Sequence, residues 1–127
     1  MIASALCIVV GTALVSIPVQ RFTLRWQHTV EKVLWEEDYV VAGEWLYLVS
    51  ARVRGSGAGM EPPPEARLVD GWFQWRPARA PLPELVLGNS GVAGEWRLCQ
   101  DSQCRTLSEI FERPIGADVI KISVCDH

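Results

Sequence analysis

The sequence lacks the residue sets that the common classes of hydrolase and metalloenzyme use. It has two histidines, His28 and His127, and neither belongs to a His-Glu-x-x-His signature or a Ser-His-Asp set. It has no carboxylate pair in the pattern of a glycoside hydrolase. No Cys-x-x-Cys pair is present to begin a zinc site. We therefore expect a non-enzymatic protein with no cofactor and no bound metal.

A surplus of basic residues is lacking too. The chain has 12 Lys and Arg against 15 Asp and Glu, a formal net charge of −3 at pH 7. An acidic balance of this kind disfavours a nucleic-acid partner. The 127 residues suffice for one domain and leave no room for two full cores. Because the 8 prolines and 10 glycines are spread along the chain, they do not indicate disorder.

Charge is absent altogether from residues 1–20, which read MIASALCIVVGTALVSIPVQ. A helix that spans a bilayer needs about 17–25 apolar residues, and the apolar region of a secretory signal about 7–15. We predict a hydrophobic helix that is an uncleaved single-span anchor or a cleaved signal peptide. A buried helix of the domain itself is the remaining alternative. The first two place residues 21–127 outside the cytoplasm.

From Arg21 onward, apolar and polar residues alternate with the period of a β-strand. Phe22, Leu24 and Trp26 would share one face of a first strand. Residues 33–41 predict a second strand, followed by a third with Trp45, Tyr47, Val49, Ala51 and Val53 on one face. Further strands are expected at 71–76, 85–87, 94–100, 105–107 and 119–125. The pattern predicts an all-β domain, a small antiparallel sandwich or barrel behind the N-terminal helix.

Two segments depart from this pattern. Residues 107–111 are expected to form one helical turn, with Ser108 as its N-cap. Residues 61–84 are rich in proline, which cannot donate to a strand ladder. We expect that arm to run at the edge of a sheet or as extended loops.

The cysteines are consistent with export. Cys99 and Cys104 flank four hydrophilic residues, so a hairpin would bring them close enough for a disulfide. Free buried thiols and a metal site are the alternatives, and the chain offers no second ligand pair for a metal. Cys125 is expected in the last strand as a small apolar core residue. A disulfide favours an oxidising compartment.

The six tryptophans are expected mainly in the core. Trp26, Trp35, Trp45 and Trp96 occupy alternating strand positions. Trp72 and Trp75 lie in the proline-rich arm and are the candidates for stacking on a ligand.

One candidate binding segment is polar and aromatic. It contains His28, Glu31 and Lys32 and continues to Trp35. His28 and Glu31 could form an acid–base pair, but no nucleophile lies nearby in the sequence. A partly buried, hydrogen-bonded histidine is the simpler interpretation.

The other candidate binding segment is rich in glycine. Its members are Arg54, Gly55, Ser56, Gly57, Gly59 and Met60. A phosphate-binding loop would lead into a helix, but residues 61–64 read Glu-Pro-Pro-Pro and the loop has no lysine. The simplest reading is a tight strand exit with positive φ. A backbone nest for an anion, or a loop against a partner protein, are the alternatives.

Residues 22–37, 54–63 and 98–104 occur in an order and spacing that we can match to a known family. The sequence resembles a family of small bacterial proteins of unknown function, often encoded beside TRAP transporters of the TAXI type with fused permease subunits. The likeness covers most of residues 22–107, and the glycine-rich string is its most specific part.

The resemblance implies an accessory of a tripartite, ion-driven uptake system for organic anions such as carboxylates. Such an accessory would lie on the periplasmic side of the inner membrane, anchored through residues 1–20 or secreted. It would contact the permease or the solute-binding protein. The competing hypotheses are a small-molecule module that binds an organic anion and a purely structural β scaffold.

Overall fold

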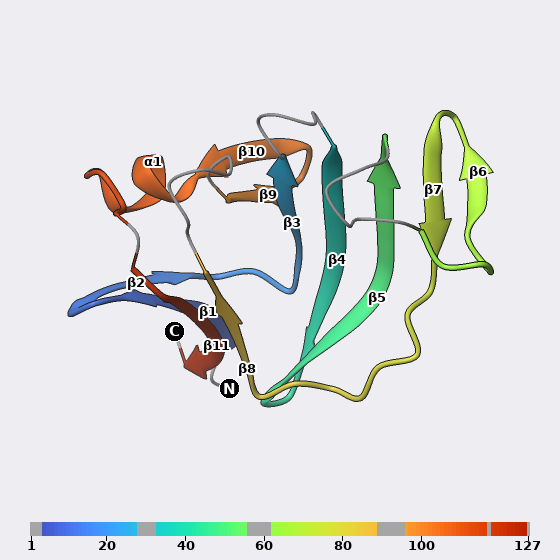
Figure 1. The fold of residues 1–127 in the computed structure, drawn as a ribbon. Coiled ribbons are helices and arrows are strands. Elements are labelled where there is room, and N and C mark those ends of the chain that lie inside the picture. Colours follow the sequence, from blue (N-terminus) through green and yellow to red (C-terminus); the bar gives the residue numbers. More distant parts are fainter. Residues whose placement is uncertain (1–3, 28–32, 56–61, 89–95, 117, 127) are drawn as a thin grey trace.

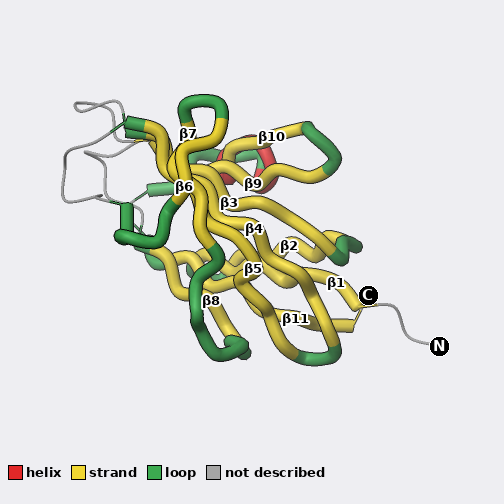
Figure 2. Tube along the Cα trace, turned by 90° about the vertical axis from the view of Figure 1, so that its right-hand side faces the viewer, coloured by secondary structure: helices red, strands yellow, loops and turns green. Residues whose placement is uncertain are grey.

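The computed structural model describes residues 4–27, 33–55, 62–88, 96–116 and 118–126. These residues form two antiparallel sheets that pack face to face in a sandwich-like fold (Figures 1 and 2). The smaller sheet has the order β2-β1-β11-β8, and the larger sheet has the order β10-β9-β3-β4-β5-β7-β6. The prediction of an antiparallel all-β domain is confirmed.

The smaller sheet consists of β1 (Ser4–Val10), β2 (Ala13–Ile17), β8 (Glu84–Leu87) and β11 (Ile120–Asp126). The larger sheet consists of β3 (Arg21–Gln27), β4 (Leu34–Ala42), β5 (Trp45–Arg54), β6 (Arg67–Val69), β7 (Trp72–Trp75), β9 (Arg97–Gln100) and β10 (Gln103–Thr106). A short helix, α1 (Leu107–Phe111), follows β10.

The core lies between the two sheets, because each sheet turns alternate apolar side chains toward the other. Leu6, Ile8, Val10, Ile120 and Ile122 come from the smaller sheet. Phe22, Leu24, Tyr39, Leu46 and Leu98 come from the larger one. The opposite face of the larger sheet, which we call the outer face, points away from the smaller sheet (Figure 2).

The prediction of an N-terminal helix is wrong. β1 lies inside the smaller sheet, hydrogen-bonded to β2 on one side and to β11 on the other. The turn between β1 and β2 contains Gly11, whose φ of 61° few other residues adopt easily. β-branched residues such as Ile8 and Val10 favour strands, and a short apolar run fits a buried strand as well as a helix. Within the described ranges, no helix is long and apolar enough to cross a membrane.

A β-bulge overturns the predicted face of β5. The pairing of β4 with β5 shifts register between Asp38 and Tyr39, which adds one residue to β5. Beyond that point the side chains of β5 exchange faces. Ala51 and Val53 remain in the core, whereas Trp45 is 45% exposed on the outer face. The expectation that Trp45 is a core residue is therefore wrong.

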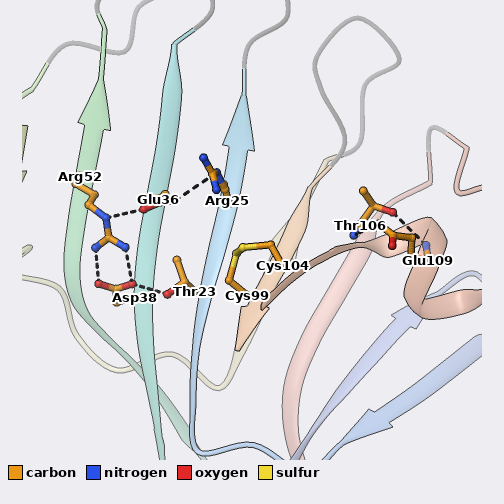
Figure 3. Close-up of a disulfide and its surroundings, with 9 residues drawn as sticks. All are labelled: Thr23, Arg25, Glu36, Asp38, Arg52, Cys99, Cys104, Thr106 and Glu109. Atoms are coloured by element: carbon orange, nitrogen blue, oxygen red, sulfur yellow. Dashed lines mark hydrogen bonds and ion pairs between the residues drawn. A yellow bond between two sulfur atoms is a disulfide. The ribbon is translucent and has the colours of Figure 1, made fainter. Parts of the chain in front are cut away.

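The helix α1 is found where it was expected, but its cap is different. Thr106, not Ser108, is the N-cap, and its hydroxyl accepts a hydrogen bond from the backbone N–H of Glu109. The Glu109 side chain in turn accepts one from the backbone N–H of Thr106 (Figure 3). The two bonds form a capping box.

The four cysteines form two disulfides. Cys99 and Cys104 are directly opposite in the β9–β10 hairpin and are bonded, as predicted (Figure 3). Cys125 is not the unpaired core thiol that we expected, because it is bonded to Cys7. A separate helix over residues 1–20 offers no strand on which Cys7 would lie beside Cys125, so the sequence pattern does not predict this pair. Two disulfides suggest an oxidising, extracytoplasmic environment.

Candidate functional site

At one end of the larger sheet the described structure is interrupted in three places, after Gln27, Gly55 and Gly88. We call this end of the sheet the loop end. Gln27, the last residue of β3, pairs with Leu34 of β4, and Leu34 pairs with Arg54 of β5. Both motif-bearing segments of the sequence therefore depart from adjacent strands at this end (Figure 1).

The third departure is marked by Gly88 and Trp96. The indole N–H of Trp96 donates to the carbonyl oxygen of Gly88 at 2.9 Å. The rings of Trp96 and Trp26 lie 6.3 Å apart, centroid to centroid. Since Trp26 sits near the end of β3, this departure also belongs to the loop end.

Most of the predicted binding residues lie outside the described residues. These are His28, Glu31, Lys32, Ser56, Gly57, Gly59 and Met60. Trp35, Arg54 and Gly55 are described, and the register places Trp35 and Arg54 on adjacent strands at the loop end.

Trp35 belongs to a row of half-buried tryptophans on the inner face of the larger sheet. It lies opposite Trp26 in the β3–β4 register. On its other side it meets Trp75 edge-to-face, with ring centroids 5.5 Å apart. Trp96 packs against the core cluster, and the contacts Trp96–Trp26 and Trp35–Trp75 continue the row across the sheet. The described contacts of Trp35 are therefore packing contacts with other tryptophans at the loop end, and aromatic pairs of this geometry stabilise such a position.

Arg54 is exposed at the end of β5 and reaches the β6–β7 hairpin. Its guanidinium carbon lies 5.8 Å from the centre of the Trp72 ring, within the range of a cation–π contact. The hairpin turn contains Asp70 and Gly71, with φ of 50° and 86°, the backbone that Asp-Gly turns favour. Gly55 has a φ of 93°, the value expected of a tight strand exit.

The outer face carries a charged network that was not predicted from the sequence (Figure 3). Arg52 donates through Nε to Glu36 at 2.6 Å and through two nitrogens to the carboxylate of Asp38, at 2.6 and 3.2 Å. Thr23 donates to Asp38 at 2.6 Å, and Arg25 lies 3.4 Å from Glu36. The two cations and two carboxylates compensate each other, so the network fits a structural role better than a catalytic one.

The network shifts the acidity of its central residue. Burial alone would lower the pKa of Arg52, but hydrogen bonds and charge attraction from Asp38 and Glu36 more than offset this and raise it. The alternation of apolar and polar residues along the two strands does predict which residues lie on the face away from the core. These are Thr23, Arg25, Glu36 and Asp38. Only the register shows that these side chains meet.

A buried tyrosine lies on the inner face of the same strands. Tyr39 is 2% exposed, stacks on Phe22 and donates its hydroxyl to Glu37 at 3.1 Å. Burial, the negative charge of Glu37 and this hydrogen bond raise the pKa of Tyr39 far above its usual range. Tyr39 therefore stays protonated and neutral at ordinary pH.

The described part of the chain contains no cluster of three or more His, Cys, Asp or Glu side chains that could hold a metal ion.

A family model, described as a domain of unknown function (DUF1850), matches residues 22–107. The chain belongs to the DUF1850 family. No curated protein and no solved structure matches it significantly. The match runs from β3 to the first residue of α1, so it contains the loop end and the outer-face network. β1, β2 and β11 lie outside the DUF1850 match, although they complete the sandwich.

Proposed function

We propose that this DUF1850 protein is a non-enzymatic accessory of a TRAP-type organic-anion uptake system of the TAXI kind. It would act on the periplasmic side of the inner membrane and contact the permease or the solute-binding protein through the loop end. The link to the transporter rests on the resemblance described above. The two disulfides support a site of action outside the cytoplasm.

One observation carries the proposed contact surface. The register Gln27–Leu34–Arg54 gathers the departures of both motif-rich segments on adjacent strands. Loops held by a rigid sheet are a common means of presenting a binding surface. The row of tryptophans packs together at that end of the sheet.

The test is an affinity pull-down of the tagged full-length protein from membranes solubilised in mild detergent, followed by mass spectrometry. The variant Arg54→Ala alters the loop end, and Arg113→Ala changes an exposed arginine that follows α1. We expect a TRAP permease or solute-binding protein to be recovered with the wild type and Arg113→Ala, and at least tenfold less with Arg54→Ala. Uptake of labelled organic anion should fall in a deletion strain.

Equal recovery by all three proteins would show that Arg54 is not part of the contact. Recovery of no transport component, together with unchanged uptake in the deletion strain, would refute the proposed function.

A further inference from the structure

The outer face of the larger sheet carries a hollow. Of the loop-end residues described above, only Trp75 belongs to its lining, at the border. β7 pairs with β5 only along Ala51–Val53, and the chain then turns away until Leu82 bridges to Leu46. Between these two points, no strand of the described structure pairs with the edge of β5. An open hollow of about 890 Å³ lies there, lined by Val49, Ser50, Glu65, Arg67, Val69, Gln74, Trp75 and Arg76.

The register brings two arginines to this hollow. Arg67 of β6 lies directly opposite Gln74 of β7. Arg76 follows Gln74 by two residues, the spacing that returns a side chain to the same face of an extended chain. The bulge in β5 turns Val49 outward beside them, leaving it 44% exposed.

These arginines differ from those of the charged network. Arg52 and Arg25 are compensated by Glu36 and Asp38. Within the described ranges, neither Arg67 nor Arg76 forms an ion pair. Among the described residues of the lining, Glu65 is the one carboxylate. These described residues therefore carry a net positive charge, in a chain whose net charge is −3.

We propose that this hollow binds an organic carboxylate with an apolar body. Guanidinium groups bind carboxylates through paired hydrogen bonds, and Gln74 and Ser50 add neutral donors. Val49 and Val69 supply apolar surface for the rest of the ligand, and Trp75 lies at the border of the hollow. The proposal does not depend on the loop-end contact, because it concerns other residues and a small ligand.

The experiment is a titration of the full chain with sodium hexanoate at constant ionic strength, with acetate, phosphate and chloride as comparison anions. Binding is followed by tryptophan fluorescence, since Trp75 lines the hollow, and by the rise of the thermal midpoint. The test variant is Arg67→Gln/Arg76→Gln and the matched control is Arg113→Gln. Circular dichroism and the unliganded midpoint confirm that each variant folds.

We expect saturable binding of hexanoate by the wild type and by Arg113→Gln, with weaker binding of acetate because its apolar body is a single methyl group. The double variant should bind hexanoate at least tenfold more weakly. No saturable response from the wild type, or equal affinity in the double variant, would overturn the site. Phosphate binding as tight as that of hexanoate would overturn the assigned ligand class.

Discussion

Arg52 is the central residue of the charged network on the outer face. It connects β5 to β4 through two carboxylates, one of which, Glu36, is only 9% exposed. Removing a cation from such a position leaves a mostly buried negative charge, which costs more than the pair itself contributes. Arg52 therefore stabilises the folded protein mainly by neutralising the carboxylate of Glu36.

We expect Arg52→Gln to lower the free energy of unfolding by about 2 kcal/mol, measured by urea denaturation. Arg21→Gln is the matched control, since Arg21 is exposed on the same face, and it should change stability by less than about 0.5 kcal/mol. Adding Glu36→Gln and Asp38→Asn to Arg52→Gln should restore part of the loss. Equal effects at Arg52 and Arg21 would contradict this account of the network.

Tyr39 should make the fold sensitive to alkali. Its pKa is raised in the folded protein, whereas in the unfolded chain a tyrosine ionises near about pH 10. Below about pH 10 this tyrosine is neutral in both states, and its contribution to the free energy of unfolding is complete. Above that pH the tyrosine of the unfolded chain ionises while folded Tyr39 stays neutral, so the free energy of unfolding falls as the pH rises. We expect Tyr39→Phe to flatten the fall of the urea midpoint between about pH 8 and about pH 11. Parallel curves for the two proteins would contradict the assignment.

At the scale of single elements, α1 shows how a five-residue helix can be held in place. The capping box fixes its start, and Leu107, 1% exposed, fixes its position against the core. A hydrogen bond from the backbone N–H of Thr106 is the main reason why the pKa of Glu109 is lowered. An isolated helix of this length would not form in water.

We expect Thr106→Ala to destabilise the protein by about 1 kcal/mol, because it leaves the backbone N–H of Glu109 without its acceptor. Thr106→Ser retains the hydroxyl and should remain close to the wild type. The measurement is the urea midpoint at neutral pH. A serine variant as unstable as the alanine variant would assign the effect to the lost methyl group instead.

The strands differ in how well the sequence predicts them. β3 and the inner face of β4 could be predicted, because Phe22, Leu24 and Tyr39 alternate with polar residues. β1 could not be separated from a helix, since an uncharged apolar run satisfies both periods. The outward turn of Trp45, Tyr47 and Val49 depends on one inserted residue in β5, which leaves no mark on the local alternation.

The candidate site, too, could be predicted from the sequence only in part. Arg54 and Gly55 could be selected from the glycine-rich string, but nothing in the sequence places Arg54 beside Trp72 and Gly71. The Arg52 network and the Arg67–Arg76 hollow both depend on strand register. Register is set by contacts between distant segments, so local patterns do not contain it.

For the whole molecule, the two disulfides should contribute unequally. Cys7 and Cys125 are separated by 118 residues, whereas Cys99 and Cys104 are separated by 5. In the chain-entropy model the long loop constrains the unfolded state by about 5 kcal/mol and the short one by about 2 kcal/mol. We expect Cys7→Ser/Cys125→Ser to lose clearly more stability in urea than Cys99→Ser/Cys104→Ser. The reverse order would show that strain or residual structure outweighs loop entropy.

The bond between Cys7 and Cys125 also decides how the molecule responds to tension. A pull applied to the chain outside these two residues opens at most the pairings of Ser4–Leu6 before the sulfur–sulfur bond carries the load, because that bond joins β1 to β11 covalently. Apart from the pairings of Ser4–Leu6 and Asp126, the paired residues of both sheets lie within the ring that the disulfide closes, so tension on the ends does not load them. Tension between the two ends of the chain therefore does not unfold the sandwich as long as the Cys7–Cys125 disulfide is intact.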